Sequence, residues 1–159
     1  MKRLLFILVT FVTVLAGCVK DPKCTYNECD LKAPSTEIQD LQNYLTNNGI
    51  AATQHCSGVF YVIHQQGSGS YPSACGDATL YYKGTLTNGT VFDETKPNQP
   101  AAFNLAGLIT GFKNGLLQVK AGGKMTMYIP PSLGYGNSPA GTIPANSILI
   151  FDVDLLSVK

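Results

Sequence analysis

The side chains of this sequence that could do chemistry are large aromatic and aliphatic ones close to predicted turns, and together they could bind an apolar ligand. They are Tyr82, Phe92, Ile109, Phe112, Tyr135, Ile143 and Phe151. Composition alone does not separate an apolar pocket of this kind from an ordinary hydrophobic core. The order of the motifs around these residues, described below, separates the two.

Other catalytic constellations are missing from the sequence. It has no Gly-x-Ser-x-Gly nucleophile elbow, no Walker loop and no Gly-x-Gly-x-x-Gly run that leads from a strand into a helix. The only histidines, His55 and His64, flank or lie in the first predicted strand, so Ser-His-Asp hydrolysis is a poor interpretation. A metal site of these histidines with Cys56 and Cys75 would match no zinc spacing. We therefore expect no metal, and no residue implies a nucleotide or redox cofactor.

The N-terminal residues have the pattern of an export signal that ends at a lipidation site. Lys2 and Arg3 precede an apolar run of signal-peptide length, and Leu15-Ala16-Gly17-Cys18 follows this run. Small residues before a cysteine fit a signal peptidase, and the Cys18 thiol can accept a lipid. We therefore expect a bacterial lipoprotein. The alternatives are an ordinary signal peptide with a chance cysteine, or a membrane anchor that is left in place.

A lipid on Cys18 would anchor an otherwise soluble body to a membrane. The next residue is Val19 rather than aspartate, which favours the outer over the inner membrane. We expect the protein in the bacterial cell envelope, on the periplasmic side or at the cell surface.

Four cysteines remain besides Cys18, and an even number in an exported chain predicts disulfides. They are Cys24, Cys29, Cys56 and Cys75. The natural pairing is the local one, Cys24 with Cys29 and Cys56 with Cys75. The sequence does not choose among the three connectivities.

The composition predicts one folded domain outside the membrane. Of the 159 residues, 45% are hydrophobic and 13% are charged, a content at which wholesale disorder is not expected. Sixteen glycines and nine prolines argue against a helical bundle or a coiled coil. No apolar run beyond the N-terminus is long enough to span a bilayer. After Cys18 the acids slightly outnumber the lysines, which argues against nucleic acid as a partner.

The sequence divides into four parts. They are a signal peptide (1–17), a tether (18–34), a helical preface (35–56) and a main domain (57–159).

In the preface, apolar residues recur at helical spacing from Ile38 to Leu45, and Asn47-Asn48-Gly49 ends the run. Thr36 and Gln39 have the spacing of a capping box at its start. We expect this helix to pack on the main domain, with a dimer contact as the alternative.

From Ser57 onward the pattern changes to strands. The predicted strands are 59–65, 79–86, 90–93, 101–105, 124–129 and 148–158. Asn88-Gly89 predicts a hairpin with a type I′ turn, which has positive φ at both residues. Gly111 and Gly115 interrupt residues 108–119, so any helix there is short. We expect an α+β fold in which one short helix lies against the apolar face of an antiparallel sheet.

Short motifs follow one another through residues 57–158 in a specific order. They are Gly76-Asp77, Leu80-Tyr81-Tyr82-Lys83-Gly84-Thr85-Leu86, Asn88-Gly89-Thr90-Val91-Phe92-Asp93, Leu108-Ile109-Thr110-Gly111-Phe112, Gly115-Leu116, Gly122-Gly123-Lys124, Ile129-Pro130-Pro131, Leu133-Gly134-Tyr135-Gly136, Ile143-Pro144 and Leu149-Ile150-Phe151-Asp152-Val153-Asp154-Leu155-Leu156. In this order and spacing the chain resembles the FKBP-type peptidyl-prolyl cis-trans isomerases. The preceding helix resembles that of exported bacterial members. The family fold, a twisted antiparallel sheet wrapped around one short helix, agrees with the elements predicted above.

The resemblance implies a pocket that can be carried over residue by residue. It assigns catalysis to Asp93, Tyr135 and Phe92, and substrate binding to Tyr82, Leu108, Ile109, Phe112, Ile143 and Phe151. In the family, the backbone N–H at the position of Ile109 contacts a ligand carbonyl.

Three departures from the family pattern should alter substrate preference and inhibitor affinity more than they abolish activity. Phe112 stands where the helix usually supplies a tryptophan, which makes the pocket floor smaller. Ala101 replaces an expected phenylalanine, which makes one wall thinner. The loop between Leu105 and Leu108 is about two residues short.

The resemblance implies a monomeric enzyme that accelerates X–Pro rotation in exported, proline-containing polypeptides without a covalent step or a cofactor. Macrolides of the tacrolimus type are the inhibitors it implies. Two other functions stay open. One is a chaperone or tethering module that binds proline-containing segments with little turnover, which Ala101 keeps open. The other is a structural envelope lipoprotein, against which Phe92, Asp93 and Tyr135 speak.

Overall fold

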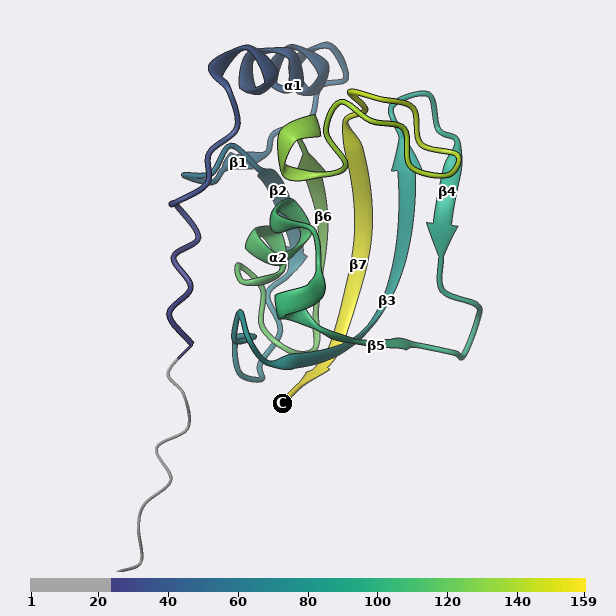
Figure 1. Ribbon diagram of the computed structural model, residues 1–159. Coiled ribbons are helices and arrows are strands. Elements are labelled where there is room, and N and C mark those ends of the chain that lie inside the picture. Colours follow the sequence, from purple (N-terminus) through teal and green to yellow (C-terminus); the bar gives the residue numbers. More distant parts are fainter. Residues whose placement is uncertain (1–23) are drawn as a thin grey trace, which may run out of the picture.

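Seven strands pair into one antiparallel sheet that curves around a short helix, in a computed structural model that describes residues 24–159 (Figure 1). The strands are β1 (Thr53–Gln54), β2 (Phe60–Gln65), β3 (Asp77–Leu86), β4 (Val91–Glu94), β5 (Ala101–Asn104), β6 (Gly123–Ile129) and β7 (Leu149–Val158). Their order is β1-β2-β6-β7-β3-β4, and β5 pairs with the first residues of β3. The predicted α+β fold is confirmed.

The two helices pack on opposite faces of the sheet. Figure 1 shows one of them inside the curve of the sheet and the other across one end of it. Helix α2 (Thr110–Leu116) lies on the concave face, and α1 (Ser35–Asn47) lies on the other face. Short 3₁₀ turns at Leu105–Gly107 and Pro131–Leu133 connect the elements around α2. As far as the structure describes the chain, no helix is both long and apolar enough to cross a membrane.

The strand alternation read from the sequence sets the two sides of the sheet. Met125, Met127 and Ile129 of β6 are no more than 1% exposed and face α2. Tyr128, between two of them, points to the other face because successive side chains of a strand alternate. There it packs with Leu41 and Leu45 of α1, so the expected docking of the preface helix on the main domain is confirmed.

The start of α1 differs from the prediction. The residue that precedes the helix is Pro34, whose carbonyl accepts the Ile38 N–H at 3.1 Å, and no side chain caps this end. Thr36 and Gln39 therefore lie inside the helix, and the predicted capping box is wrong. Gln39 instead donates a hydrogen bond to Asn43 Oδ1 at 3.1 Å.

The turn between β3 and β4 also differs. Gly89 has φ of +84°, but Asn88 does not share this left-handed conformation, so the predicted type I′ turn is wrong. The Gly89 N–H closes the turn on the Leu86 carbonyl at 2.9 Å, and the Asn88 side chain accepts the Thr90 N–H at 2.9 Å. One left-handed glycine therefore suffices, in a loop that is one residue longer than a two-residue hairpin.

Two disulfides join residues far apart in the chain, so the local pairing is wrong. The bonds are Cys24–Cys75 and Cys29–Cys56. The Ala33 N–H bonds to the Ser57 carbonyl at 2.9 Å, which lays the preceding segment alongside residues 55–57. This brings the Cys29 and Cys56 Cα atoms to 5.5 Å, a normal span for a disulfide. Residues 24–33 of the predicted tether are thus fastened to the domain.

The expected signal peptide, residues 1–17, and the expected lipidation site, Cys18, lie outside the described residues.

The contact between α2 and β6 predicts different costs for two glycine substitutions. A Cβ on Gly111 would lie 2.2 Å from Ile129 Cγ2, whereas one on Gly115 would lie 2.8 Å from Met127 Sδ. Ile129 is branched and buried, but the methionine side chain is flexible and can move. We expect Gly111→Ala to lower the free energy of unfolding by about 2–3 kcal/mol. Gly115→Ala should lower it by less than about 1 kcal/mol, because alanine also favours the helix.

Urea unfolding with the disulfides intact measures both values. Equal losses for the two variants would contradict this account of the helix contact.

Candidate active site

A cavity of about 280 Å³ opens between the concave face of the sheet and the start of α2. Its lining is mostly aromatic and aliphatic: Tyr82, Asp93, Phe103, Gly107, Leu108, Ile109, Phe112, Tyr135 and Phe151. Seven of these nine residues are among the nine site residues predicted from the sequence. The size suits a single ring with its adjoining amide groups, and an apolar lining with few polar groups is typical of small-ligand sites.

Four aromatic rings form the floor and walls of the cavity. The centroids of Phe112 and Phe151 lie 4.9 Å apart with the rings nearly perpendicular, and both side chains are 5% exposed. Tyr82 lies 6.3 Å from each of these rings and 5.8 Å from Phe103. Edge-to-face packing of this kind fixes ring orientation. The apolar surface is therefore preformed.

The polar part of the wall is the pair Tyr82 and Asp93. The Tyr82 hydroxyl, from the middle of β3, donates to Asp93 Oδ2 on β4 at 2.5 Å. Burial raises the pKa of Tyr82, and the hydrogen bond to Asp93 raises it further. Thr95 holds the Tyr82 backbone: its side-chain oxygen accepts the Tyr82 N–H at 3.2 Å, and its own N–H donates to the Tyr82 carbonyl at 3.0 Å.

The start of α2 contributes a backbone donor. Ile109 precedes the helix with an extended backbone (φ −54°, ψ 142°) and lines the cavity. Within residues 24–159 its N–H has no hydrogen-bond acceptor. A bound carbonyl group could therefore occupy this position.

Tyr135 lies at the rim and is 45% exposed. It follows the 3₁₀ turn Pro131–Leu133, in which the Ser132 N–H donates to Glu37 Oε2 of α1 at 2.9 Å. The Gly134 and Gly136 N–H groups, on either side of Tyr135, both donate to the Pro131 carbonyl. These bonds hold the backbone that carries the tyrosine.

Two predicted site residues do not line the cavity. Phe92 lies edge-on to Phe151 with centroids 5.4 Å apart, and its ring rests against Gly84, where a Cβ would meet it at 2.5 Å. Ile143 is 6% exposed and belongs to the core, where its N–H bonds to the Ala140 carbonyl. Both lie behind the lining rather than in it.

Two lining residues, Phe103 and Gly107, were not predicted. Phe103 lies on β5, opposite Ala78 of β3, and its ring faces Tyr82. The signal was available, because Phe103 is two residues beyond Ala101 and strand alternation puts both on one face. Phe103 thus forms part of the cavity wall next to Ala101, where the family pattern has a second phenylalanine. Gly107 ends a 3₁₀ turn and has no comparable signal.

Of the four residues weighed as metal ligands, only His55 and Cys56 lie together among the described residues. Cys56 and Cys75 belong to different disulfides, and His64 Nε2 lies 2.8 Å from Thr126 Oγ1.

A sequence model of the FKBP-type peptidyl-prolyl cis-trans isomerases matches residues 71–156. The protein named FKBP-type peptidyl-prolyl cis-trans isomerase FkpA from Buchnera aphidicola subsp. Schizaphis graminum is 40% identical over 121 residues, 75% of this chain and 47% of that protein. The chain spans about half the length of the curated relatives it matches.

Two solved structures show the same fold. The crystal structure of FkpA from Escherichia coli has a TM-score of 0.69 and 35% identity, over 78% of this chain and 58% of that one. A peptidyl-prolyl cis-trans isomerase from Pseudomonas syringae pv. tomato also has a TM-score of 0.69, with 26% identity, over 80% of this chain and 98% of that one.

The raised pKa of Tyr82 predicts how stability changes at alkaline pH. Folding raises the pKa of Tyr82, so the protonated hydroxyl stabilises the folded protein. This stabilisation is complete below the ordinary tyrosine pKa of about 10, and it is lost as the pH rises from there through the pKa of Tyr82 in the folded protein. We expect Tyr82→Phe to lose less stability than the wild type between about pH 9 and pH 11.

Urea unfolding at the two pH values measures this difference. Tyr81→Phe, at the neighbouring residue on β3, is the matched control for the loss of a tyrosine hydroxyl. Identical pH dependence in Tyr82→Phe and the wild type would contradict the assignment.

Proposed function

The chain belongs to the FKBP-type peptidyl-prolyl cis-trans isomerases, and we propose that its cavity accelerates rotation about X–Pro bonds in polypeptide substrates. The observation that carries this proposal is the preformed aromatic cavity with the Tyr82–Asp93 pair in its wall. Its size matches a proline ring with the adjoining amide.

The reaction needs no bond to be made or broken. The X–Pro amide resists rotation because its C–N bond has partial double-bond character, with a barrier of roughly 18–20 kcal/mol. At ninety degrees of twist this resonance is lost, and the amide becomes less polar. An apolar, preformed cavity stabilises the twisted amide relative to the planar, well-solvated one, which lowers the barrier.

Each part of the lining has a proposed role. Phe112, Phe151 and Ile109 grip the prolyl ring, and Leu108 and Phe103 extend this apolar surface. The Ile109 N–H and the Tyr135 hydroxyl donate to substrate carbonyl groups on either side of the ring. Asp93 holds Tyr82 in place and presents its carboxylate to the rotating amide.

Phe92 and Ile143 act from behind the lining. Phe92 holds the Phe151 ring in its orientation, because the two rings pack edge to face. Ile143 anchors the loop that follows Tyr135 into the core. Their substitution should therefore weaken activity through the position of neighbours rather than through lost contact with the substrate.

We further propose that the chain is a lipoprotein of the bacterial cell envelope and acts on exported polypeptides. The support is the sequence Leu15-Ala16-Gly17-Cys18 after an apolar run, together with two disulfides, which form in oxidising compartments. Slow X–Pro isomerisation limits protein folding on a scale of tens to hundreds of seconds, so newly exported chains are suitable substrates.

Asp93→Ala should lower kcat/KM for cis-to-trans isomerisation of a short X–Pro peptide by at least about tenfold, which corresponds to about 1.4 kcal/mol of lost transition-state stabilisation. The variant loses the partner that orients Tyr82. The protein should begin directly after Cys18, so that the disulfides of Cys24 and Cys29 are kept.

Glu94→Ala is the matched control, since Glu94 is an exposed acid on the same strand with its side chain on the other face. It should keep full activity. The chain has no tryptophan, so quenching of tyrosine emission by the peptide reports binding separately from turnover. A folded Asp93→Ala variant with undiminished kcat/KM would overturn the proposed site.

Cys18→Ser should abolish membrane attachment in a bacterial host. The wild type should partition into the membrane fraction and carry the added mass of acyl chains, whereas the variant should remain in the aqueous fraction. Membrane partition of both proteins to the same extent would contradict the lipid anchor.

A further inference from the structure

The segment of residues 24–33, called the strap below, covers the outer side of α2 (Figure 1). The Tyr26 hydroxyl donates to Asn114 Oδ1 at 2.5 Å, and Asn114 Nδ2 donates to the Glu28 carbonyl at 3.0 Å. Lys113 Nζ lies 4.5 Å above the Tyr26 ring. Asn114 is completely buried, so both polar groups of its amide depend on the strap.

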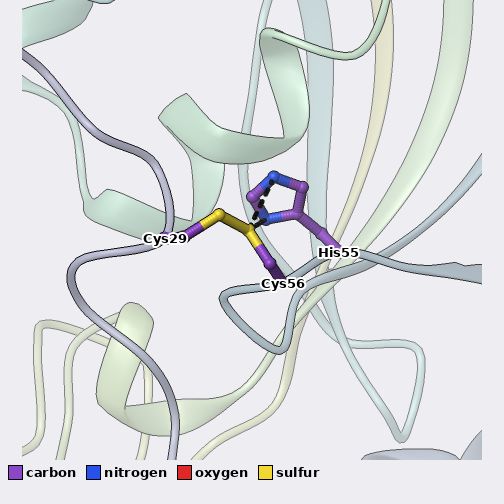
Figure 2. A group of neighbouring side chains, drawn as sticks. All are labelled: Cys29, His55 and Cys56. Carbon is purple, nitrogen blue, oxygen red and sulfur yellow. Dashed lines mark hydrogen bonds between the residues drawn. A yellow bond between two sulfur atoms is a disulfide. The ribbon is translucent and has the colours of Figure 1, made fainter.

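The disulfide Cys29–Cys56, which closes the strap, lies against an imidazole. Figure 2 shows the ring of His55 beside the Cys56 sulfur, 3.6 Å from Nε2 and 3.8 Å from Nδ1. Glu28 Oε2 lies 3.1 Å from His55 Nε2, and the Glu28 carboxylate also accepts from Gln118 Nε2 at 2.8 Å. The His55 side chain is only 9% exposed. The carboxylate and the sulfur atom thus both lie close to Nε2 of the imidazole.

The second disulfide, Cys24–Cys75, has no such neighbour. Among residues 24–159, the one cluster of cysteine, histidine and acidic side chains close enough to share a ligand is Cys29, His55 and Cys56. Both Cys24 and Cys75 are exposed, whereas Cys29 is half-buried and only Cys56 of its disulfide is exposed. Accessibility alone would therefore make Cys24–Cys75 the first bond to be reduced.

We propose that Cys29–Cys56 is a thiol–disulfide exchange site for a dithiol reductant, with Cys56 as the leaving thiolate stabilised by His55. One thiolate of the dithiol attacks Cys29 Sγ and forms a mixed disulfide. The Cys29–Cys56 bond breaks, and its electron pair passes to Cys56 Sγ.

The second thiol of the reductant then displaces Cys29 and closes the reductant's own disulfide. Two electrons have moved from the dithiol to the cysteines, and its two protons end on Cys29 and on the Cys56–His55 pair.

The physical reason is the position of the imidazole beside the leaving sulfur. A protonated histidine beside a sulfur atom lowers the pKa of its thiol, and a thiol of lower pKa leaves faster in exchange. The other contacts of the ring are Glu28 Oε2 at Nε2, and the Ser57 N–H and hydroxyl at Nδ1.

Opening this bond releases the part of the strap that contacts α2, while Cys24–Cys75 keeps the segment attached. Because α2 carries Phe112 of the cavity floor, exchange at this site would loosen the cavity. Only the effect of this loosening on isomerase activity rests on the proposed function. The exchange itself can be tested without any measurement of isomerase activity.

The test is limited reduction of the chain with dithiothreitol, followed by alkylation and peptide mass spectrometry. We expect alkylated Cys29 and Cys56 to accumulate about tenfold faster than alkylated Cys24 and Cys75. Equal rates, or earlier reduction of Cys24–Cys75, would overturn the proposal. This comparison uses the wild type and needs no variant to fold.

His55→Gln should remove the difference by slowing reduction of Cys29–Cys56 about tenfold, with the rate at Cys24–Cys75 unchanged. His64→Gln is the matched control and should leave both rates as they are. An unchanged Cys29–Cys56 rate in a folded His55→Gln variant would also overturn the assignment. Hydrogen exchange of residues 110–118 should quicken when Cys29–Cys56 alone is open, and unchanged protection would contradict release of the strap.

Discussion

The cavity depends on how closely α2 lies on the sheet. Gly111 and Gly115 present no side chains to Ile129 and Met127, so the helix rests directly on β6. This approach places Phe112 edge-on to Phe151, with both rings within reach of Tyr82. Dispersion contacts weaken steeply over fractions of an ångström, so a helix held further out would lose the floor of the cavity. The aromatic lining thus depends on glycine at positions 111 and 115.

Two N-terminal elements outside residues 71–156, the part that matches the family, support this arrangement. The strap satisfies the buried amide of Asn114 on the outer side of α2. Helix α1 packs on the other face of the sheet and reaches the turn before Tyr135 through Glu37 and Ser132. One element therefore fixes the floor of the cavity, and the other fixes its rim.

The sequence predicted what depends on local alternation and missed what depends on tertiary proximity. The buried faces of β6 and β7 follow from a period of two, and the motif order placed Tyr82, Asp93 and Tyr135 at one cavity. The disulfide pairs could not be predicted, because they follow from where the strap lies on α2. Phe92 and Ile143 lie behind the lining of the cavity, and a motif does not distinguish a side chain that lines a cavity from one that supports the lining. The prediction of the hairpin turn type was wrong because the sequence Asn-Gly allows two left-handed residues but does not require them.

The bond Cys24–Cys75 has a mechanical consequence. It joins residue 24 to the start of β3, where Asp77 and Lys159 exchange backbone hydrogen bonds at 3.2 and 2.8 Å. A pulling force between residue 24 and residue 159 would therefore pass through one covalent cross-link and one pair of hydrogen bonds. The shortest path for the tension leaves out α1, α2 and the cavity. If the domain is tethered through residue 24, a force between the tether and residue 159 would therefore act on this disulfide and these hydrogen bonds, and not on the aromatic rings of the cavity.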